Sequence, residues 1–442
     1  MPLTDAMPFL AALCLAAGLA PLALAAAPGP EPARAEAPAA PDPEARVRGI
    51  QAALRSAQID GWLFFDFRDS NPIAARILMM PEGTIATRRW LYFIPADGQP
   101  VRIVHAIEEG RLDHLPGTKK VYSSWVTLQN EIKAALKGKA KIAMEYSPDG
   151  AIPYIGRVDA GTIEFVKKQG VTVVSSGDLV QRFEAVWGPR EKALHDQAAV
   201  TLHELVDGAW KMIARSIRSN APIDEHTVQQ FLWKGIQSRG LTADHPPNVS
   251  VNANAANPHY DVPETGSAPI RQGDLVLIDI WAKVDEPGAV YADFTLMGSV
   301  EQTVSQNYIK IWNIVRDARD AALKFVRDSA AAGRLPQGWQ VDDAARQVIT
   351  AAGYGPQFIH RTGHNIDEEV HGNGAHMDNL ESHDDRRLMD HTCFSIEPGI
   401  YLKGQFGVRS EIDVYLEGKE AQVTGRAPQT EIVPILSLVP PA

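Results

Sequence analysis

The chain has 442 residues, of which 45% are hydrophobic and 22% are charged, and its formal net charge is -11. This length predicts about two domains, and the composition is that of a globular protein. The acidic balance argues against a nucleic-acid binder, which needs a basic face.

The N-terminus predicts export. Residues 9–25 form an Ala/Leu-rich apolar run that ends in small residues, so we expect a signal peptide over residues 1–27 and a periplasmic or secreted protein. Asp5 makes the start of this signal atypical, and an uncleaved anchor is the alternative, although Gly18 and Pro21 interrupt the run. An Ala/Pro-rich leader follows over residues 28–45. We expect no membrane contact after cleavage, and Cys393 is then left without a disulfide partner.

Residues 46–186 predict a mixed α/β domain. Helices are expected at residues 46–57 and 128–136, and strands at residues 61–67, 89–94, 101–105, 141–145 and 171–175. We expect Trp62, Phe64 and Phe67 to belong to its core rather than to a cofactor site, and this part shows no catalytic constellation.

Residues 187–442 predict a second domain, which begins at Trp187-Gly188-Pro189. A long helix carries an apolar stripe from Leu202 to Ile217. Further helices are expected at residues 222–238, 306–329 and 340–352, and extended segments at residues 249–253, 275–283, 290–298, 393–396 and 411–416. A helix pair followed by strands thus occurs twice, which hints at a duplicated half-domain.

Two aspartates interrupt apolar strands of this second domain. Asp279 ends the run Leu-Val-Leu-Ile, and Asp293 lies in Tyr-Ala-Asp-Phe-Thr. An unpaired buried carboxylate is costly, so each must pair, protonate or bind a metal, and a salt bridge is an equal alternative for either one alone. The intervening residues 284–289 contain Pro-Gly and predict a hairpin that turns both carboxylates to one side.

Six of the thirteen histidines fall between His360 and His391. We expect His376, His383 and His391 to be solvated, because their stretch is polar. His360, His364 and His371 are instead interleaved with glycines and apolar residues, and a neutral imidazole can bind a metal or carry a proton.

Glu397 and Glu411 adjoin two further extended segments, and with the two aspartates and one histidine they form a two-metal ligand set. Hard oxygen ligands with one imidazole favour two Mn²⁺ ions, with Co²⁺, Zn²⁺ or Fe²⁺ as alternatives. The sequence contains no HExxH, CxxC, Gly-rich phosphate loop or Gly-x-Ser-x-Gly motif.

These blocks resemble those of the M24 metallopeptidases, a family that includes aminopeptidase P, prolidase and the methionine aminopeptidases. The matching stretches are Leu277-Ile-Asp279, Tyr291-Ala-Asp293-Phe-Thr295, His360-x-x-Gly-His364, Ile396-Glu397-Pro-Gly399 and Arg409-Ser-Glu411. The resemblance implies an α+β fold: a pita-bread (creatinase/aminopeptidase-like) catalytic domain preceded by a smaller creatinase-type α/β domain. It also implies an Xaa-Pro aminopeptidase or dipeptidase, in which a hydroxide that bridges two metals attacks the bond before proline of a small peptide.

The resemblance also implies a role for each matching residue. Asp279 would bind one metal, Asp293 and Glu411 would bridge both, and His364 and Glu397 would bind the second, with Glu397 also taking a proton from the water. His259 and His371 would contact the substrate, His360 would be a further catalytic histidine, and Arg409 would bind substrate. A homodimer is expected by analogy.

The sequence departs from the family pattern at four positions, which we expect near the substrate face. Leu296 stands where the family usually has Arg, Asn365 and Asp367 where it typically has Gly, and Gly372 where an acid is common. Alternatives therefore stay open: a metal-dependent lyase or a C–N hydrolase of a small molecule on the same scaffold, or a non-catalytic binding module. The physiological metal, the preferred peptide length and the need for proline are not decided by the sequence.

Overall fold

The computed structural model describes residues 42–440 except 82, 84 and 85. The predicted signal peptide and most of the predicted leader lie outside the described residues. Among the residues that are described, no helix is long and apolar enough to cross a membrane.

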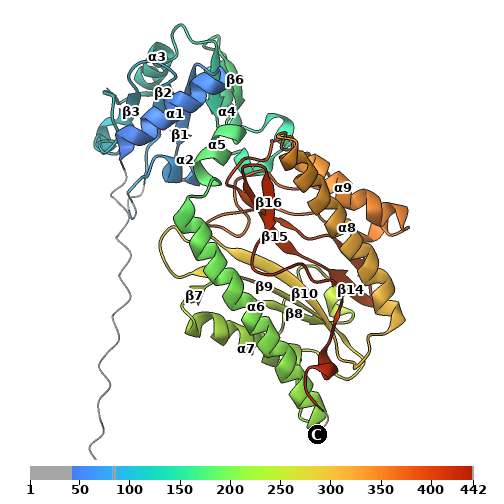
Figure 1. Ribbon diagram of the computed structural model, residues 1–442. Helices are drawn as coiled ribbons and strands as arrows, with labels where there is room; N and C mark the ends of the chain where they lie inside the picture. The colour runs from blue at the N-terminus through green and yellow to red at the C-terminus, as the bar shows by residue number, and fades with distance from the viewer. Residues whose placement is uncertain (1–41, 82, 84–85, 441–442) are drawn as a thin grey trace, which may run out of the picture. The chain divides into compact units, whose positions relative to one another are not determined.

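The first part of the chain is built on one mixed sheet with the strand order β4-β3-β2-β1-β5-β6 (Figure 1). Its strands are β1 (Gly61–Asp66), β2 (Trp90–Pro95), β3 (Val101–His105), β4 (Thr118–Tyr122), β5 (Lys141–Met144) and β6 (Thr172–Ser175). Its helices are α1 (Pro43–Ala57), α2 (Pro72–Ile77), α3 (Trp125–Ala135), α4 (Ala160–Lys167) and α5 (Gly177–Glu184).

The central strand β1 is buried on both faces. Trp62 and Phe64 pack into one hydrophobic cluster and Leu63 and Phe65 into another, as expected for a strand whose successive side chains alternate between two covered faces. The prediction for Phe67 was wrong: it lies beyond the end of the strand and is 43% exposed.

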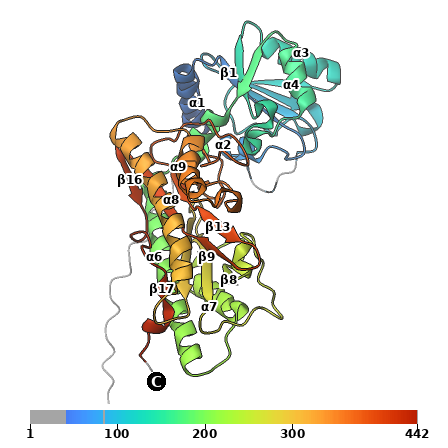
Figure 2. The same cartoon turned by 90° about the vertical axis from the view of Figure 1, so that its right-hand side faces the viewer.

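The second part of the chain has two helix pairs. They are α6 (Pro189–Arg218) with α7 (Glu225–Ser238), and α8 (Gln306–Ala331) with α9 (Gly338–Ala351). The strands lie between these pairs in Figure 1, and the turned view shows α8 and α9 side by side (Figure 2). The predicted order of a helix pair followed by strands, repeated once, is therefore present.

The strands of the second part form separate sheets. One contains β7 (Leu241–Thr242), β8 (Asn248–Val251), β9 (Leu275–Val284), β10 (Ala292–Ser299) and β17 (Val433–Pro434). Another contains β11 (Asn365–Ile366), β12 (Cys393–Ile396), β15 (Ile412–Glu417) and β16 (Glu420–Val423). The hairpin β13 (Gly399–Leu402) and β14 (Phe406–Arg409) pairs by itself.

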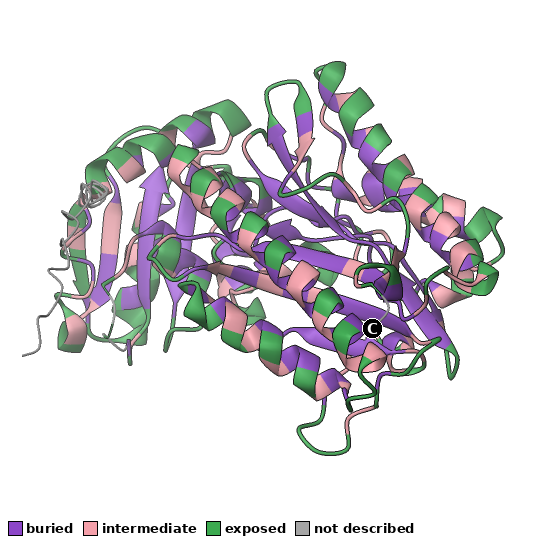
Figure 3. Cartoon of the chain, turned by 60° about the horizontal axis from the view of Figure 1, so that its bottom comes forward, coloured by how far each residue is buried: buried purple, intermediate pink, exposed green. Residues whose placement is uncertain are grey.

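Strand β9 explains where the polar site can form. Val276, Ile278 and Ile280 point into the cluster beneath α6 and α7, whereas Leu275 and Leu277 point into the cluster beneath α8 and α9. Buried positions accordingly run along the inner strands, and the outer faces of the helices are exposed (Figure 3). Along the second face the apolar residues stop after Leu277, and the next residue on that face is Asp279.

Candidate metal centre

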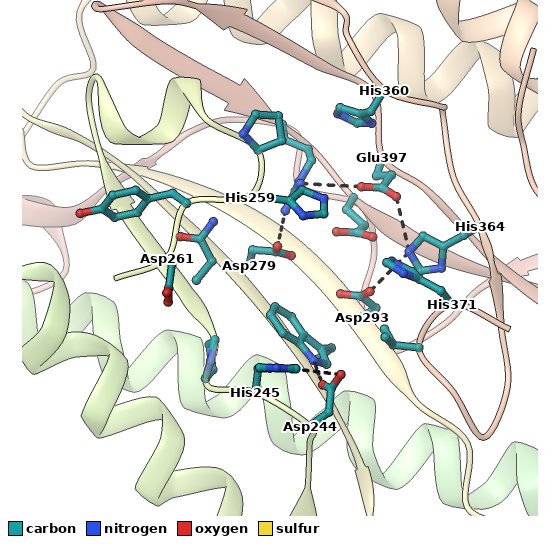
Figure 4. Close-up of a pocket in the computed structure, with 18 of the residues that line it drawn as sticks. Asp244, His245, His259, Asp261, Asp279, Asp293, His360, His364, His371 and Glu397 are labelled. Carbon is teal, nitrogen blue, oxygen red and sulfur yellow. Dashed lines mark hydrogen bonds and ion pairs between the residues drawn. The ribbon is translucent and has the colours of Figure 1, made fainter. Parts of the chain in front are cut away.

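Asp279 and Asp293 reach one face of the sheet because β9 and β10 are an antiparallel pair. Asp279 lies opposite Thr295, and Asp293 lies opposite Trp281. Residues two apart on a strand share a face, so both carboxylates point to the same side. The predicted hairpin is confirmed, and Figure 4 shows the two side chains in one pocket.

The two glutamates come from the neighbouring sheet. Glu397 directly follows β12 and Glu411 directly precedes β15, and these strands are paired. The Glu411 amide donates to the Thr295 carbonyl (3.2 Å), which ties this end of β15 to β10. The Thr295 hydroxyl lies 2.9 Å from Asp279 Oδ1 and 2.7 Å from Glu411 Oε2. It therefore links carboxylates from two different sheets.

His364 is oriented with one ring nitrogen toward the carboxylates. Its Nδ1 lies 3.2 Å from the Asn365 carbonyl, to which it donates. In the neutral ring Nε2 then carries the lone pair. It lies 3.4 Å from Glu397 Oε1 and 3.6 Å from Asp293 Oδ2. Gly363 permits this approach, because a Cβ there would lie 1.9 Å from the Ser395 carbonyl oxygen.

The electrostatics of this cluster call for a cation. Burial, and then the neighbouring carboxylates, raise the pKa of Asp293 and of Glu411 well above the ordinary values. Burial also raises the pKa of Glu397 to about 7, although Arg409 and Arg361 act in the opposite direction. Burial lowers the pKa of His364, which leaves it neutral and able to ligate.

The donor set fits a metal ion. Asp293, His364 and Glu411 each offer a ligand atom, and these atoms lie within 4.8 Å of one another. Asp293 Oδ1 is buried and, among the described residues, has no hydrogen-bond partner. A buried carboxylate oxygen without a donor is stabilised by a bound cation. Asp279 and Glu397 adjoin this trio and line the same cavity of about 610 Å³.

Arg409 lies among the acids rather than in open space. Its guanidinium pairs closely with Asp279 and lies 3.8 Å from Glu397 Oε2, and its Nε donates to the Thr295 hydroxyl (2.8 Å). It lines the cavity, but it is only 5% exposed. These contacts are therefore with two of the predicted metal ligands and with the threonine that links Asp279 to Glu411.

The three further histidines predicted in the site all line the cavity, but their rings differ in the contacts that hold them. His259 is exposed on the segment between β8 and β9 (Figure 4). His371 is also exposed, and its ring meets the His364 ring edge-on at 4.3 Å; desolvation, followed by the charges of Arg361 and His259, lowers its pKa. His360 has both ring nitrogens engaged, Nδ1 with the Arg361 carbonyl (2.6 Å) and Nε2 with the Tyr401 hydroxyl (2.7 Å).

Sequence reasoning missed several residues of the site. Tyr401, Trp281 and Tyr154 carry no motif, and only the first two have a local signal, because they lie four and two residues after a predicted ligand. The expectation that His376 is solvated was wrong: it is fully buried, and its ring lies 4.2 Å from that of Tyr154.

The expected position of the family departures also needs correction. Leu296, Asn365, Asp367 and Gly372 do not line the cavity. Leu296 packs against the cluster beneath α6 and α7. Asn365 donates to the Cys393 carbonyl (2.9 Å), and Asp367 accepts from the amide of Glu369 (2.8 Å). Leu296 therefore serves packing, and Asn365 and Asp367 serve the structure of the chain beside the pocket.

Comparisons with known proteins agree with this geometry. The sequence profile of metallopeptidase family M24 matches residues 198–417. The Xaa-Pro dipeptidase of Lactobacillus helveticus is 36% identical over 163 residues, which are 37% of this chain and 40% of that relative. The chain thus aligns with less than half of the length of this curated relative.

Two solved structures show the fold. Dipeptidase PepE from Mycobacterium ulcerans has a TM-score of 0.62 at 22% identity and covers 88% of this chain and 97% of its own. The recombinant prolidase from Thermococcus sibiricus has a TM-score of 0.57 at 24% identity, with 89% and 100% covered. The predicted pita-bread fold is confirmed by these likenesses. The profile match over residues 198–417, together with the carboxylate–histidine cluster, shows that the chain belongs to metallopeptidase family M24.

Proposed function

We propose that this chain is a two-metal exopeptidase that removes the residue preceding proline from a small peptide, as an Xaa-Pro aminopeptidase or dipeptidase. The observation that carries the proposal is the convergence of four carboxylates and one neutral imidazole on a single cavity. The printed name of the Lactobacillus helveticus relative supports the choice of substrate.

Asp279, Asp293, His364, Glu397 and Glu411 would hold two divalent ions, for which we favour Mn²⁺ over Co²⁺, Zn²⁺ or Fe²⁺. When bound, such ions lower the pKa of water and polarise a carbonyl group. Asp293 and Glu411 come from different sheets, and the Glu411 amide is tied to β10, so these two carboxylates would hold the ions between the sheets.

The remaining chemistry falls to the chain's own side chains. Glu397 would take a proton at Oε2, the oxygen turned toward Arg409 rather than toward His364. His371, neutral because of its low pKa, would donate a hydrogen bond to the carbonyl oxygen of the scissile bond. His259 would contact the substrate from the segment between β8 and β9. His360 is held by Tyr401, so it would act through that tyrosine rather than on the peptide.

The decisive test measures metal content and peptide cleavage together. We expect purified protein supplied with Mn²⁺ to cleave Xaa-Pro dipeptides or Xaa-Pro-Yaa peptides and to leave matched Xaa-Ala peptides largely intact. If metal is bound but every peptide stays intact, the exopeptidase proposal fails and a lyase or C–N hydrolase takes its place. If the folded protein binds no divalent ion, the metal centre itself is wrong.

Glu397→Ala is the matching variant. It should abolish turnover and weaken metal binding, because it removes both a ligand and the proposed proton acceptor. Glu417→Ala is the control, since Glu417 is an exposed glutamate at the far end of β15. Export and homodimerisation stay predictions from the sequence, and cell fractionation and sedimentation test them.

A further inference from the structure

One buried glutamate outside the metal cluster holds the segment that carries His259. Glu225 is the first residue of α7 and is 0% exposed. It is the acceptor for four donors: the Val251 amide (2.8 Å), Asn254 Nδ2 (2.9 Å), the Tyr260 hydroxyl (2.9 Å) and the Ala268 amide (3.0 Å). None of these contacts belongs to the proposed metal site.

The four donors are spread along residues 251–268, the connection between β8 and β9. Val251 ends β8, Asn254 begins a short 3-10 helix, Tyr260 follows His259, and Ala268 lies near the return to β9. The Glu225 amide also donates to the Ala268 carbonyl (3.1 Å). A single side chain thus fastens the beginning, the middle and the end of this segment.

The ends of the segment have further support, since Asn252 hydrogen-bonds Asp274 and Leu275 and Ser267 accepts from the His226 amide. Around His259 the remaining hydrogen bonds are local ones to Asn257. Ala255 and Val262 are buried, but residues 257, 259, 261 and 263–266 are exposed, and the segment contains no strand. His259 itself is exposed while it lines the cavity (Figure 4). The place of its imidazole therefore depends on the backbone on either side, and the nearest anchored side chain is that of Tyr260.

We propose that Glu225 is a positioning residue, which holds His259 at the substrate side of the cavity through Tyr260 and the two ends of the segment. The inference rests on the proposed function, because it takes His259 as a substrate-contacting group. The chemistry of the anchor is specific: a carboxylate offers only acceptors, and each of its two oxygens faces one backbone N–H and one side-chain donor.

Replacement of Glu225 by glutamine cannot reproduce this arrangement. Its amide nitrogen would face a backbone N–H on whichever side it lies, and a buried donor left unpaired is costly. Glu225→Gln should therefore loosen the segment. Tyr260→Phe is the milder variant: it deletes the hydroxyl's contacts with Glu225 and with Asn254 Nδ2 (3.0 Å), and it leaves both backbone contacts to Glu225 in place. It covers the case in which Glu225→Gln does not fold.

The test is a double-mutant cycle with His259→Ala, followed by Xaa-Pro cleavage in the presence of Mn²⁺. We expect Tyr260→Phe to lower kcat/KM about 10-fold, mainly through KM, with metal content unchanged. In the His259→Ala background the same change should cost less than about 2-fold. An equal loss in both backgrounds would overturn the inference, because Glu225 and Tyr260 would then act without His259.

Hydrogen exchange provides a readout that does not need activity. Amides within residues 252–268 should exchange faster in Glu225→Gln and in Tyr260→Phe than in the wild type. Tyr92→Phe is the matched control, since it deletes a tyrosine hydroxyl bonded to the Pro116 carbonyl (2.9 Å) in the first sheet. Unchanged exchange in both variants would refute the positioning role. If exchange is faster in the variants but the wild type itself cleaves no peptide, the anchor is upheld and the failure lies with the proposed function.

Discussion

His364 and His371 lie in one short segment, but their imidazoles have different neighbours. His364 Nε2 lies 3.4 Å from Glu397 and 3.6 Å from Asp293. His371 lies edge-on to His364, lines the cavity and forms no ion pair among the described residues. His371 is exposed, but desolvation by the surrounding protein and the charge of Arg361 lower its pKa below the ordinary value, so the ring is neutral at physiological pH and has an N–H to donate.

His371→Ala should therefore separate catalysis from metal binding. We expect kcat to fall about 100-fold, which is the usual cost of losing one hydrogen-bond donor to a developing oxyanion. Metal content should stay within experimental error of the wild type. His383→Ala is the control, because His383 is exposed and stacks on Trp339 away from the cavity. Loss of metal in His371→Ala would show that the roles of the histidines are assigned wrongly.

Asp293 shows how the ligand cluster opposes folding without a cation. It is 5% exposed, its Oδ1 has no hydrogen-bond partner in the described part of the chain, and burial followed by the charge of Asp279 raises its pKa. Its backbone amide is held separately by Asp413 Oδ2 (2.9 Å). A neutral isostere would therefore relieve repulsion without loss of that contact.

We expect Asp293→Asn to stabilise the chelator-treated protein by about 1–3 kcal/mol and to lose most of its metal. Thermal unfolding with EDTA and then with Mn²⁺ measures both effects: the variant should have the higher Tm in EDTA and a smaller gain from Mn²⁺. Asp384→Asn is the contrast, because Asp384 forms a buried pair with Arg386 (2.6 Å) and its loss should lower Tm in both conditions. A lower Tm for Asp293→Asn in EDTA would contradict the repulsion argument.

For single residues, the sequence was informative where the neighbours along the chain indicate the chemistry of the side chain. A carboxylate that ends an apolar strand, such as Asp279, is visible in one dimension because burial makes it costly. Tyr154 cannot be recognised from its local sequence, because its place in the cavity depends on residues more than two hundred positions away. His376 was misjudged for a related reason: its polar neighbours in sequence are not its neighbours in space.

Three of the departures from the family pattern, Asn365, Asp367 and Gly372, compensate one another. A Cβ at Gly372 would lie 2.2 Å from Asp367 Oδ2 and 2.3 Å from Asn365 Oδ1. Longer side chains at positions 365 and 367 therefore occupy the space that Gly372 leaves open. Because the three residues pack on each other beneath the pocket, their change from the family pattern alters the support of His371 and not the cavity wall. This weakens the argument for a different reaction.

In the first sheet, Glu145 joins four separate elements. Directly after β5, its carboxylate accepts from Trp62 Nε1 of β1 (2.6 Å), from Asn71 Nδ2 at the start of α2 (2.8 Å) and from the Ser176 hydroxyl before α5 (3.2 Å). It is 0% exposed, and burial raises its pKa to about 7 despite these donors.

This pKa predicts a pH-dependent stability with a definite sign. The folded state holds the proton more tightly than the unfolded state, whose pKa is near the ordinary 4.5. The contribution of Glu145 is therefore fully present below pH 4.5 and is lost as pH rises through about 7, a change of about 3 kcal/mol. Urea unfolding measures this change. The free energy of unfolding of the wild type minus that of Glu145→Gln should fall by this amount between pH 4.5 and 7.5. A difference that grows with pH would contradict the assignment.

Element prediction succeeded where periodicity is long. The helix over residues 306–329 and the strand over residues 275–283 differ from α8 and β9 only at their ends. Strand β4 was missed, because its sequence Thr-Lys-Lys-Val-Tyr has only one buried residue and it pairs at the edge of the sheet. The start of α1 was placed three residues late, since Asp42 caps the helix and Pro43 opens it.

At the scale of the whole molecule, the first part of the chain contributes to the cavity formed by the second. The Tyr154 hydroxyl accepts from Arg361 Nη1 (2.7 Å), and Tyr154 lines the cavity together with the proposed ligands. Gln181 of α5 supports the same region, because it accepts from the Ala375 amide (2.8 Å) and donates to the Arg387 carbonyl (2.8 Å). The first part therefore completes a wall of the site, although its sequence shows no catalytic constellation.

Tyr154→Phe should consequently affect substrate binding rather than chemistry. Loss of the hydroxyl leaves the Arg361 guanidinium without this acceptor beside the cavity, so we expect KM for an Xaa-Pro peptide to rise about 5–10-fold, with kcat and metal content unchanged. Steady-state kinetics and metal analysis measure these effects. Tyr146→Phe is the matched control in the same part of the chain, since the hydrogen bond of the Tyr146 hydroxyl among the described residues is with Lys167 (3.5 Å), a surface residue. An unchanged KM would show that the first part of the chain supports the fold of the site without taking part in binding, and a fall in kcat with constant KM would place Tyr154 closer to the reacting atoms than we infer.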